Sequence, residues 1–537
     1  MKKTLVPIIF LVIFGCGLFF FNIGGRDLWK PDEPRWAQTG KNMFDGESWI
    51  IPHLNGEVDA TKPPMLFWLI ALSGKLLGTM DEQAARLPSA FFGVLTLVIV
   101  FFFARKLFDE KTGFFSAFIL ASSGSFYWFA RRVSMDVPMT FFVTLSIFLF
   151  YTGYQREDRR TLFYSLAYVA MALGGLLKTY PGWFIPALVI GAYFLIRKEW
   201  KFFFDPAHIW GVSLFILIVG GWLSLAYLEG GKDYVVGLLI QQTAALAFKT
   251  SYYSHSFLFF FWTFPSEFLP WIFFLPLAII FCLKEKEKNE NFFFLLSWII
   301  AVFCLFSLGM MKRDLYLLPL YPAAALLAGH FWSNAIKQEG QSQLLTLPLV
   351  LFFIVLFIIG LSAPFAITKF GTRYLSRPLE VGIVYSVIVC LGSLFGLLSY
   401  FFGRKSLSFY LIVLIFFSGA TYTSLSILPD VNRHISPRPF SQQVVNIIGR
   451  EGKLATYRFF ESYFNFYTGR NRILEIENEE GLKRFLTSQK KTYCIVPQRE
   501  WQDLLNKDNS WKAYLIAEGR IGDKEFVVIG NGGAKEQ

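Results

Sequence analysis

The sequence predicts a polytopic α-helical membrane protein, with about thirteen transmembrane helices and a small α/β domain at its C-terminal end. Hydrophobic residues make up 54% of the chain and charged residues only 17%, whereas a soluble domain averages about 25% charged residues. Apolar runs of roughly 20 residues recur, and each is long enough to cross a bilayer core. These runs are continuous rather than alternating, which favours helices over strands.

Charge in the loops orients the predicted spans. Clusters such as Arg159 and Arg160 fall in alternate loops, so the positive-inside rule places these loops and the N-terminus in the cytoplasm. Residues 23–87, 228–256 and 428–537 are then expected on the outer side. The candidate spans are residues 4–22, 88–104, 113–129, 138–154, 162–177, 181–196, 208–227, 257–283, 292–309, 315–332, 345–363, 380–402 and 407–427.

Two domains are expected, a membrane domain of residues 1–427 and a soluble domain of residues 428–537. The first outer loop, residues 23–87, contains the amphipathic stretch "PPMLFWLIALSGKLLG", which we expect to lie along the membrane interface. The C-terminal segment alternates β-like runs such as "YCIVP" and "EFVVIG" with polar helical stretches such as "NEEGLKRFLTSQ". The net charge of +12 lies mostly in short loops, which indicates membrane topology rather than a nucleic-acid partner.

The outer side carries cations that the positive-inside rule disfavours. They are Arg26, Lys30, Arg35, Lys62, Arg131, Arg132, Lys178, Lys312 and Arg313, all near predicted span ends. Each one alone is explained by a side chain that reaches toward lipid headgroups. As a set, they predict binding of an anionic lipid phosphate through charge-assisted hydrogen bonds.

Carboxylates join these cations in two outer loops. Asp32 and Glu33 lie in "LWKPDEPRWAQTG", and Asp136 lies in "RRVSMDVPMT". A carboxylate among cations serves as a general base or as a group that orients an arginine or lysine. The alternative for Asp32 is an N-cap of the helix that begins near Pro34, and a carboxylate saturated by backbone donors would be a poor base.

Two further outer residues have a functional and a structural interpretation. His255, in "KTSYYSHSF", is either a metal ligand or an interfacial side chain among tyrosines. Tyr316, in "KRDLYLLPLYP", is either a donor to a phosphate or a member of the aromatic belt.

Several segments together resemble one enzyme family. The segments "RDLWKPDEPRWAQTG", "LNGEVDATKPPMLFWL", "RRVSMDVPMT" and "SLGMMKRDLYLLPLYPAAALL", taken in this order, are similar to bacterial lipid-linked sugar transferases of the protein-mannosyltransferase type. The aminoarabinose transferases that modify lipid A belong to the same group. The resemblance runs through nearly all of the membrane part, and it is weaker in the C-terminal segment.

The resemblance implies a glycosyltransferase of the GT-C fold in the bacterial inner membrane. A polyprenyl (undecaprenyl) phosphate donor would enter from the bilayer. The sugar would pass, with inversion, to lipid A or a related envelope glycolipid on the periplasmic face. The enzyme is expected to act as a monomer, with its active site and its C-terminal domain in the periplasm.

Family roles fall on particular residues of this chain. The conserved first-loop aspartate falls on Asp32, as the catalytic carboxylate, and the second loop aspartate on Asp136. Lys62 and Tyr316 would contact the donor phosphate, with help from Arg131 or Arg132. The family's Lys-Gly-Pro stretch reads "KTYPGW" here, which makes Lys178 a further phosphate contact.

The resemblance also raises the question of a divalent metal. In the family, a glutamate before the lysine of the Glu-Lys-Pro-Pro motif helps to hold the metal, together with a histidine that aligns with His255. Thr61 replaces that glutamate here and cannot supply a carboxylate, and Asp59 is the nearest acidic residue before it.

Two other functions remain open from the sequence. A protein O-mannosyltransferase would share the donor but act on serine or threonine of exported proteins. A transporter or flippase of polyprenyl lipids would also need outer cations, but it would form no glycosidic bond. Neither the transferred sugar nor the acceptor follows from the residues.

Overall fold

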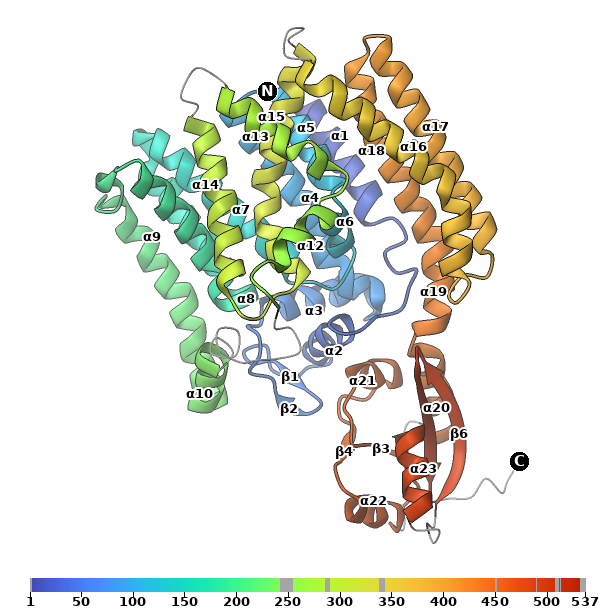
Figure 1. Cartoon of the computed structure of the whole chain (residues 1–537). Helices are drawn as coiled ribbons and strands as arrows, with labels where there is room; N and C mark the ends of the chain where they lie inside the picture. Colours follow the sequence, from blue (N-terminus) through green and yellow to red (C-terminus); the bar gives the residue numbers. More distant parts are fainter. Residues whose placement is uncertain are drawn as a thin grey trace.

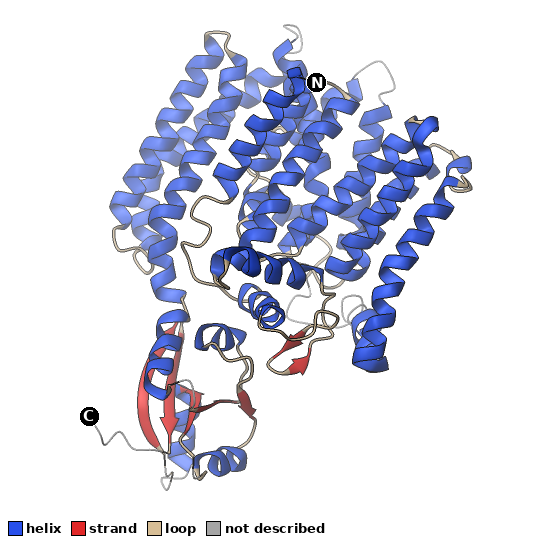
Figure 2. Cartoon of the chain, turned by 180° about the vertical axis from the view of Figure 1, so that it is seen from behind, coloured by secondary structure: helices blue, strands red, loops and turns tan. Residues whose placement is uncertain are grey.

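The structure is a computed structural model that describes residues 2–241, 255–284, 290–337, 343–449, 452–488, 490–507, 511 and 513–531. It has a bundle of long helices and a smaller domain at one end (Figure 1). The N-terminus lies at the opposite end of the bundle in both views (Figures 1 and 2). Much of the loop predicted over residues 228–256 falls outside the described residues.

The bundle follows the predicted hydrophobic runs along the chain. Its main helices are α1 (Lys2–Phe19), α4 (Glu82–Leu107), α5 (Glu110–Ala121), α6 (Gly124–Ala130), α7 (Asp136–Gln155), α8 (Arg160–Ile196), α9 (Ala207–Phe215), α10 (Gly221–Val236), α12 (Phe259–Glu267), α13 (Leu275–Lys284), α14 (Glu290–Leu308), α15 (Tyr321–Lys337), α16 (Gln343–Gly371), α17 (Pro378–Phe401) and α18 (Lys405–Tyr422). Short 3₁₀ or π segments join several of them, including η6 (Asp314–Leu320) before α15 and η8 (Thr423–Ile427) after α18.

Burial separates a central helix from peripheral ones. In the most apolar window of η6 and α15, 94% of the residues are buried, whereas the share for α16 is 17%. Since all of these helices are apolar, the exposed faces of the peripheral helices match a lipid environment. The chain is therefore a multi-pass membrane protein whose core is built around α15.

Counted by helix length and hydropathy alone, the described spans are fewer than the thirteen predicted. Among the described residues, nine helices are long and apolar enough to cross a membrane, or ten if the bent pair α12 and α13 is one span. The difference has three sources: α1 is a short apolar helix, α5 and α6 are separated at Ser122 and Ser123, and α8 counts once although two spans were predicted there.

A sharp bend divides α8 at Lys178 and Thr179, where the backbone leaves helical geometry. A Cβ atom on Gly182 would lie 2.0 Å from the carbonyl carbon of Gly174, so the two backbones are in contact. Residues eight positions apart in a straight helix are separated by about 12 Å. The chain therefore reverses at Lys178, which lies at the tip of a helical hairpin.

The first loop folds into short elements at the end of the bundle that carries the smaller domain (Figure 1). They are α2 (Glu33–Phe44), the two-stranded antiparallel pair β1 (His53–Leu54) and β2 (Glu57–Val58), and α3 (Met65–Leu77). Helix α3 has 13 residues, and a helix of that length is about 20 Å long, which is too short to cross a bilayer core.

The C-terminal segment has the predicted α/β character. Its five strands, β3 (Lys453–Tyr457), β4 (Leu474–Ile476), β5 (Thr492–Pro497), β6 (Tyr514–Ile521) and β7 (Lys524–Gly530), form a mixed sheet in the order β4-β3-β5-β7-β6. Helices α20 (Arg438–Ile448) and α21 (Ser462–Thr468) bury one face, and α22 (Glu479–Leu486) and α23 (Gln498–Lys507) bury the other. The segment reaches the bundle through α19 (Leu428–Ile435), which follows η8.

Candidate active site

A group of charged residues meets where the first loop covers the end of the bundle. We call it the site cluster and define it as Asp32, Lys62, Asp136, Lys178, Arg313 and Tyr316. Its members come from the start of α2, the segment before α3, the start of α7, the tip of the α8 hairpin and η6. Segments far apart in the sequence therefore place five ionisable side chains and one adjacent aromatic ring together.

Asp32 precedes α2 but does not cap it through its side chain. Its Oδ2 atom instead accepts a hydrogen bond from Nη2 of Arg313 at 2.5 Å, and 27% of the Asp32 side chain is exposed. The N-cap alternative therefore does not describe its carboxylate, because no backbone donor of the helix saturates it. A partly exposed carboxylate held by an arginine is available to a ligand on its open side.

Asp136 begins α7 and is buried. It forms an ion pair with Lys178 from the hairpin tip, and the Lys178 ammonium also lies 4.5 Å from the centre of the Tyr316 ring. This contact is a cation–π interaction. Asp136 and Tyr316 together fix the position of a lysine that the sequence placed at the outer end of a span.

Lys62 lies close to both aspartates and to Lys178. Burial first, and then the charge of Lys178, lower the pKa of its ammonium group to about 8, although Asp136 and Asp32 act in the opposite direction. For Arg313, burial alone would lower the pKa, but the hydrogen bond that Arg313 donates to Asp32 and the charges of Asp32 and Asp136 outweigh it and raise the pKa. The cluster thus holds three cations against two carboxylates.

Glu33, next to Asp32, is fully buried and has partners of its own. Its carboxylate accepts hydrogen bonds from Nη1 of Arg26 at 2.6 Å and from Nε of Arg86 at 2.9 Å, and also from the backbone N–H of Val133. Arg132 completes the group, with Nε 3.8 Å from Oε2 of Glu33. Glu33 is therefore the ionic centre that ties the first loop to α4 and to the segment after α6.

Residues 61–223 match a family model described as dolichyl-phosphate-mannose-protein mannosyltransferase. The chain is similar to this family over that segment, and it is a glycosyltransferase. It is 28% identical to an uncharacterised Aquifex aeolicus protein over 96% of both chains. It is also 26% identical to the undecaprenyl phosphate-alpha-4-amino-4-deoxy-L-arabinose arabinosyl transferase of Pseudomonas paraeruginosa, over 61% of this chain and 60% of that one.

The fold of this glycosyltransferase is also that of a solved structure. The crystal structure of ArnT from Cupriavidus metallidurans bound to undecaprenyl phosphate superposes with a TM-score of 0.81. The match covers 98% of both chains at 19% sequence identity. At this identity the likeness establishes the fold, including the C-terminal domain, and leaves the substrates to be argued from the site.

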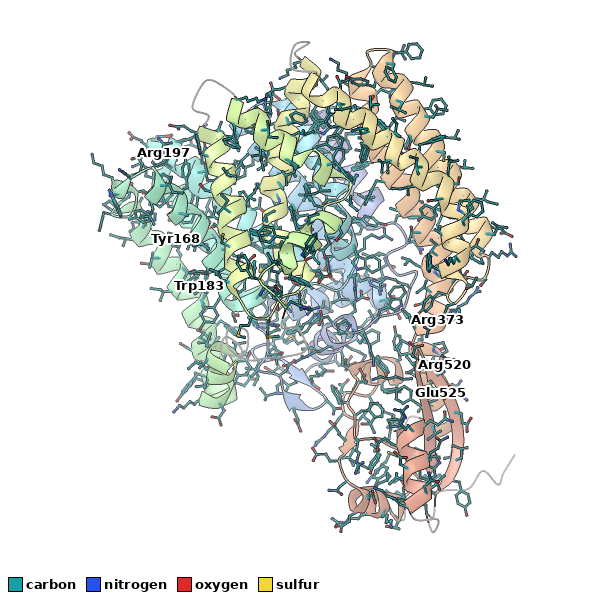
Figure 3. All side chains as sticks on the ribbon, in the orientation of Figure 1. Tyr168, Trp183, Arg197, Arg373, Arg520 and Glu525 are labelled. Carbon is teal, nitrogen blue, oxygen red and sulfur yellow. The ribbon has the colours of Figure 1, made fainter. Side chains whose placement is uncertain are left out.

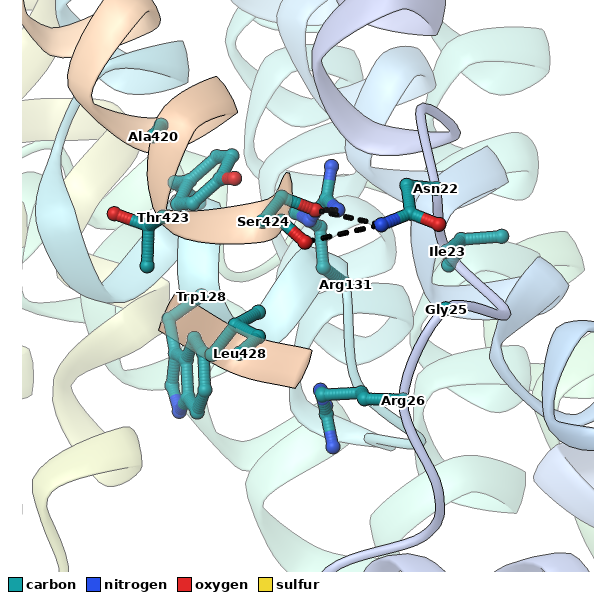
Figure 4. Close-up of a pocket in the computed structure, with 11 residues that line it drawn as sticks. Asn22, Ile23, Gly25, Arg26, Trp128, Arg131, Ala420, Thr423, Ser424 and Leu428 are labelled. Atoms are coloured by element: carbon teal, nitrogen blue, oxygen red, sulfur yellow. Dashed lines mark hydrogen bonds between the residues drawn. The ribbon is translucent and has the colours of Figure 1, made fainter. Parts of the chain in front are cut away.

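Arg131 and Arg132 lie outside the site cluster of the glycosyltransferase. Arg131 donates to the Leu18 carbonyl at 2.7 Å and to the Ser424 hydroxyl at 3.0 Å, beside a cavity of about 70 Å³ (Figure 4). Arg132 lies against Glu33, as described above. Arg131 thus joins the end of α6 to α1 and η8, whereas Arg132 contacts the buried Glu33 of α2.

The residues expected to hold a metal do not form a site here. The His255 ring is exposed and stacks on Phe259 at 4.4 Å. Both Asp59 oxygens lie 3.0 Å from Nη2 of Arg35, and the Thr61 hydroxyl donates to the same carboxylate at 2.6 Å. The described part of the chain contains no group of three or more His, Cys, Asp or Glu side chains arranged for a metal ion.

The pairing of Arg313 with Asp32 is the feature that sequence reasoning missed. Arg313 stood among the nine outer cations, directly before the "DLYLLPLYP" motif, but nothing local connects it to a residue 281 positions away. Glu33 was missed for a similar reason. Its neighbours in sequence do not reveal that Arg26 and Arg86 approach it from both sides.

Proposed function

We propose that this glycosyltransferase moves a sugar from a polyprenyl-phosphate donor to lipid A or a related envelope glycolipid on the periplasmic face of the bacterial inner membrane. The observation that carries the proposal is the site cluster itself. One partly exposed carboxylate, Asp32, lies beside Lys62 and Arg313, and Lys178 lies near Lys62; the three cations together suit a phosphate-bearing donor. The named activity of the Pseudomonas relative and the lipid bound to ArnT support the choice of donor.

The reaction needs an incoming oxygen and a leaving phosphate on opposite sides of the anomeric carbon. The acceptor oxygen forms the new bond to that carbon while the bond to the phosphate oxygen breaks, which inverts the configuration. Asp32 takes or orients the acceptor proton. The polyprenyl phosphate departs with the electron pair of the broken bond.

The cations act on the leaving group. Lys62 and Lys178 stabilise the charge that grows on the departing phosphate, and such fixed charges accelerate transfer because they are oriented before the reaction. Tyr316 keeps Lys178 in place through its ring, and Asp136 does so through its carboxylate. Arg313 holds Asp32 on the acceptor side of the cluster.

Sidedness is part of the proposal. The site cluster and the C-terminal domain lie at the end of the bundle opposite the N-terminus (Figure 1). If the N-terminus is cytoplasmic, as the loop charges predict, the site faces the periplasm. We also propose that residues 1–427 and 428–537 form the two domains and that the enzyme acts as a monomer.

A transfer assay separates the candidate functions. Purified protein in detergent is mixed with a radiolabelled polyprenyl-phosphate sugar and with either lipid A or a serine- and threonine-containing peptide. Label on lipid A supports the proposal, and label on the peptide alone supports the protein O-mannosyltransferase alternative. Label on neither acceptor, with a panel of pentosyl, hexosyl and uronosyl donors, contradicts transfer and favours the transporter alternative.

A further inference from the structure

The C-terminal domain contacts both segments of the first loop that lead to the site cluster. One segment, residues 27–30, leads to Asp32, and the other, residues 53–59, leads to Lys62. Figure 1 shows α21 of the domain beside α2, β1 and β2. The domain also meets the bundle near Arg373 and Arg520 (Figure 3). There, Arg373 of the bundle forms an ion pair with Asp523, in the turn after Arg520.

The first segment is fixed by polar groups from α19, α20 and α21. The buried carboxylate of Asp27 accepts from Nδ2 of Asn432 at 2.8 Å and from the hydroxyl of Ser436 at 2.6 Å. The hydroxyl of Tyr467 accepts from the backbone N–H of Leu28 at 2.7 Å and donates to Glu82 at 2.9 Å.

These contacts act on the main chain a few residues before Asp32. The backbone N–H of Asp27 and the indole of Trp29 both donate to Oδ1 of Asn432, at 3.0 and 2.9 Å. On the inner side, Nη2 of Arg86 donates to the Asp27 carbonyl at 2.8 Å. The segment is thus held from the bundle and from the C-terminal domain at once.

The second segment is fixed by one asparagine. Nδ2 of Asn55 donates to the Ile473 carbonyl at 2.9 Å, and Oδ1 accepts from the Ile473 N–H at 2.7 Å. Its Oδ1 also accepts from Nδ2 of the buried Asn465 at 2.9 Å. The Asn55 amide therefore imitates a strand pairing and attaches the β1–β2 turn to the domain.

We infer that the C-terminal domain is a positioning element that sets the distance between Asp32 and Lys62, with Tyr467 of the domain and Asn55 of the first loop as the two positioning residues. The inference rests on the proposed function. Tyr467 acts on the catalytic side through Leu28. Asn55 acts on the phosphate side, because the β1–β2 pair and the Asp59 N–H bond to the Pro52 carbonyl lead from it toward Lys62.

Three variants of the full-length enzyme distinguish this role from simple support of the fold. Tyr467→Phe keeps the ring but loses both hydrogen bonds of the hydroxyl. Asn55→Gly keeps the backbone conformation, because the φ of Asn55 is +56° and glycine adopts such values readily. Asn55→Asp is a milder variant that keeps the acceptor and loses the donor.

We expect the substitution of Tyr467 to change mainly kcat and the substitutions of Asn55 to change mainly the KM for the donor. Tyr467→Phe should lower kcat about 5- to 20-fold with the KM for the donor within twofold. Asn55→Gly should raise that KM about fivefold or more with kcat within twofold, and Asn55→Asp should fall between. Arg458→Ala is the matched control, since Arg458 pairs with Glu500 at 3.1 Å on an exposed face of the same domain, and it should change neither constant.

The activity of Asp32→Asn shows whether the positioning role or the proposed function has failed. If Asp32→Asn is inactive while Tyr467→Phe, Asn55→Gly and Asn55→Asp all retain the kcat and KM of the wild type, the positioning role is overturned and the function stands. Lower yield of folded protein with unchanged kinetic constants also overturns it, because that pattern belongs to structural support. If Asp32→Asn is fully active, the proposed function fails first.

Discussion

Nη2 of Arg313 lies 2.5 Å from Oδ2 of Asp32, although 281 positions separate the two residues. The contact joins the first loop to η6, directly before the central helix α15. It gives Asp32 a fixed orientation and a neighbouring positive charge. A carboxylate held in this way is aimed before substrate arrives, which is the condition for efficient proton transfer.

Arg313→Ala should therefore lower kcat by about 10- to 100-fold, because the Asp32 carboxylate loses its orientation. Arg313→Lys should recover part of the loss, since it keeps the charge without the planar fork of donors. Steady-state transfer rates measured in detergent check the prediction. Equal rates for Arg313→Ala and the wild type would show that the pairing does not serve the reaction.

The lowered pKa of Lys62 predicts that donor binding depends on pH. Burial first, and then Lys178, lower the pKa of its ammonium to about 8. The phosphodiester of the donor keeps its single charge in this range and binds the protonated lysine. The KM for the donor should thus rise about tenfold between pH 7 and pH 9, as Lys62 loses its proton.

Lys62→Arg separates this effect from other titrations. A guanidinium stays charged throughout this range, so the variant should show a nearly constant KM for the donor from pH 7 to pH 9. A wild-type KM that is flat over the same interval, or a variant that keeps the rise, would assign the titration to another group.

Substitution of Glu33 should reduce the stability of the protein rather than its catalytic rate. Glu33 is fully buried between Arg26 and Arg86, and removal of one partner of a buried ion pair costs about 3–5 kcal/mol. Glu33→Gln should therefore lower the thermal unfolding temperature in detergent by many degrees. The exposed Glu157→Gln, which changes a carboxylate in the opposite loop, should leave that temperature unchanged.

Acid should act on the same residue in a defined direction. Burial alone would raise the Glu33 pKa, but the charges of Arg26, Arg86 and Arg132 outweigh it and hold the pKa well below its ordinary value. The stabilisation is thus fully present above the unfolded pKa and is lost as the pH falls through the lower, folded pKa.

The sequence predicted much of the fold because hydrophobic runs are long and local. The strands "KLATY", "TYCIVP" and "KEFVVIG" of the C-terminal domain follow the predicted β-like runs. The short strand β4 and the helices α21 and α23 carry weaker local signals and were not foreseen. The bend at Lys178 was placed correctly as a boundary between two apolar runs, since "KTYPGW" interrupts them.

The site was predictable only in part. Asp32, Lys62, Asp136, Lys178 and Tyr316 stood out as polar groups at span ends, and the structure brings them together. The partners of Asp32 and Glu33 depend on long-range packing, which no local pattern encodes. The partners of Arg131 are equally hidden from local patterns, because Leu18 and Ser424 lie near the beginning and the end of the membrane domain in sequence.

Sidedness can be read by cysteine labelling of intact spheroplasts. Arg520→Cys, at the exposed end of strand β6 in the C-terminal domain, should react with a membrane-impermeant maleimide before lysis. Arg159→Cys, on an exposed loop at the other end of the bundle, should react only after lysis. The exposed native Cys16 and Cys304 are replaced by serine in both variants. The reverse pattern would place the site cluster in the cytoplasm.

The most direct test of the whole account is sugar transfer by Asp32→Asn. The account predicts that its kcat falls by about 10²- to 10⁴-fold, while the donor still binds and the protein still folds. Asp45→Asn, which removes a partly exposed carboxylate paired with Lys41 in the same loop, should transfer sugar at the wild-type rate. Near-normal turnover by Asp32→Asn would contradict the central claim that this carboxylate activates the acceptor.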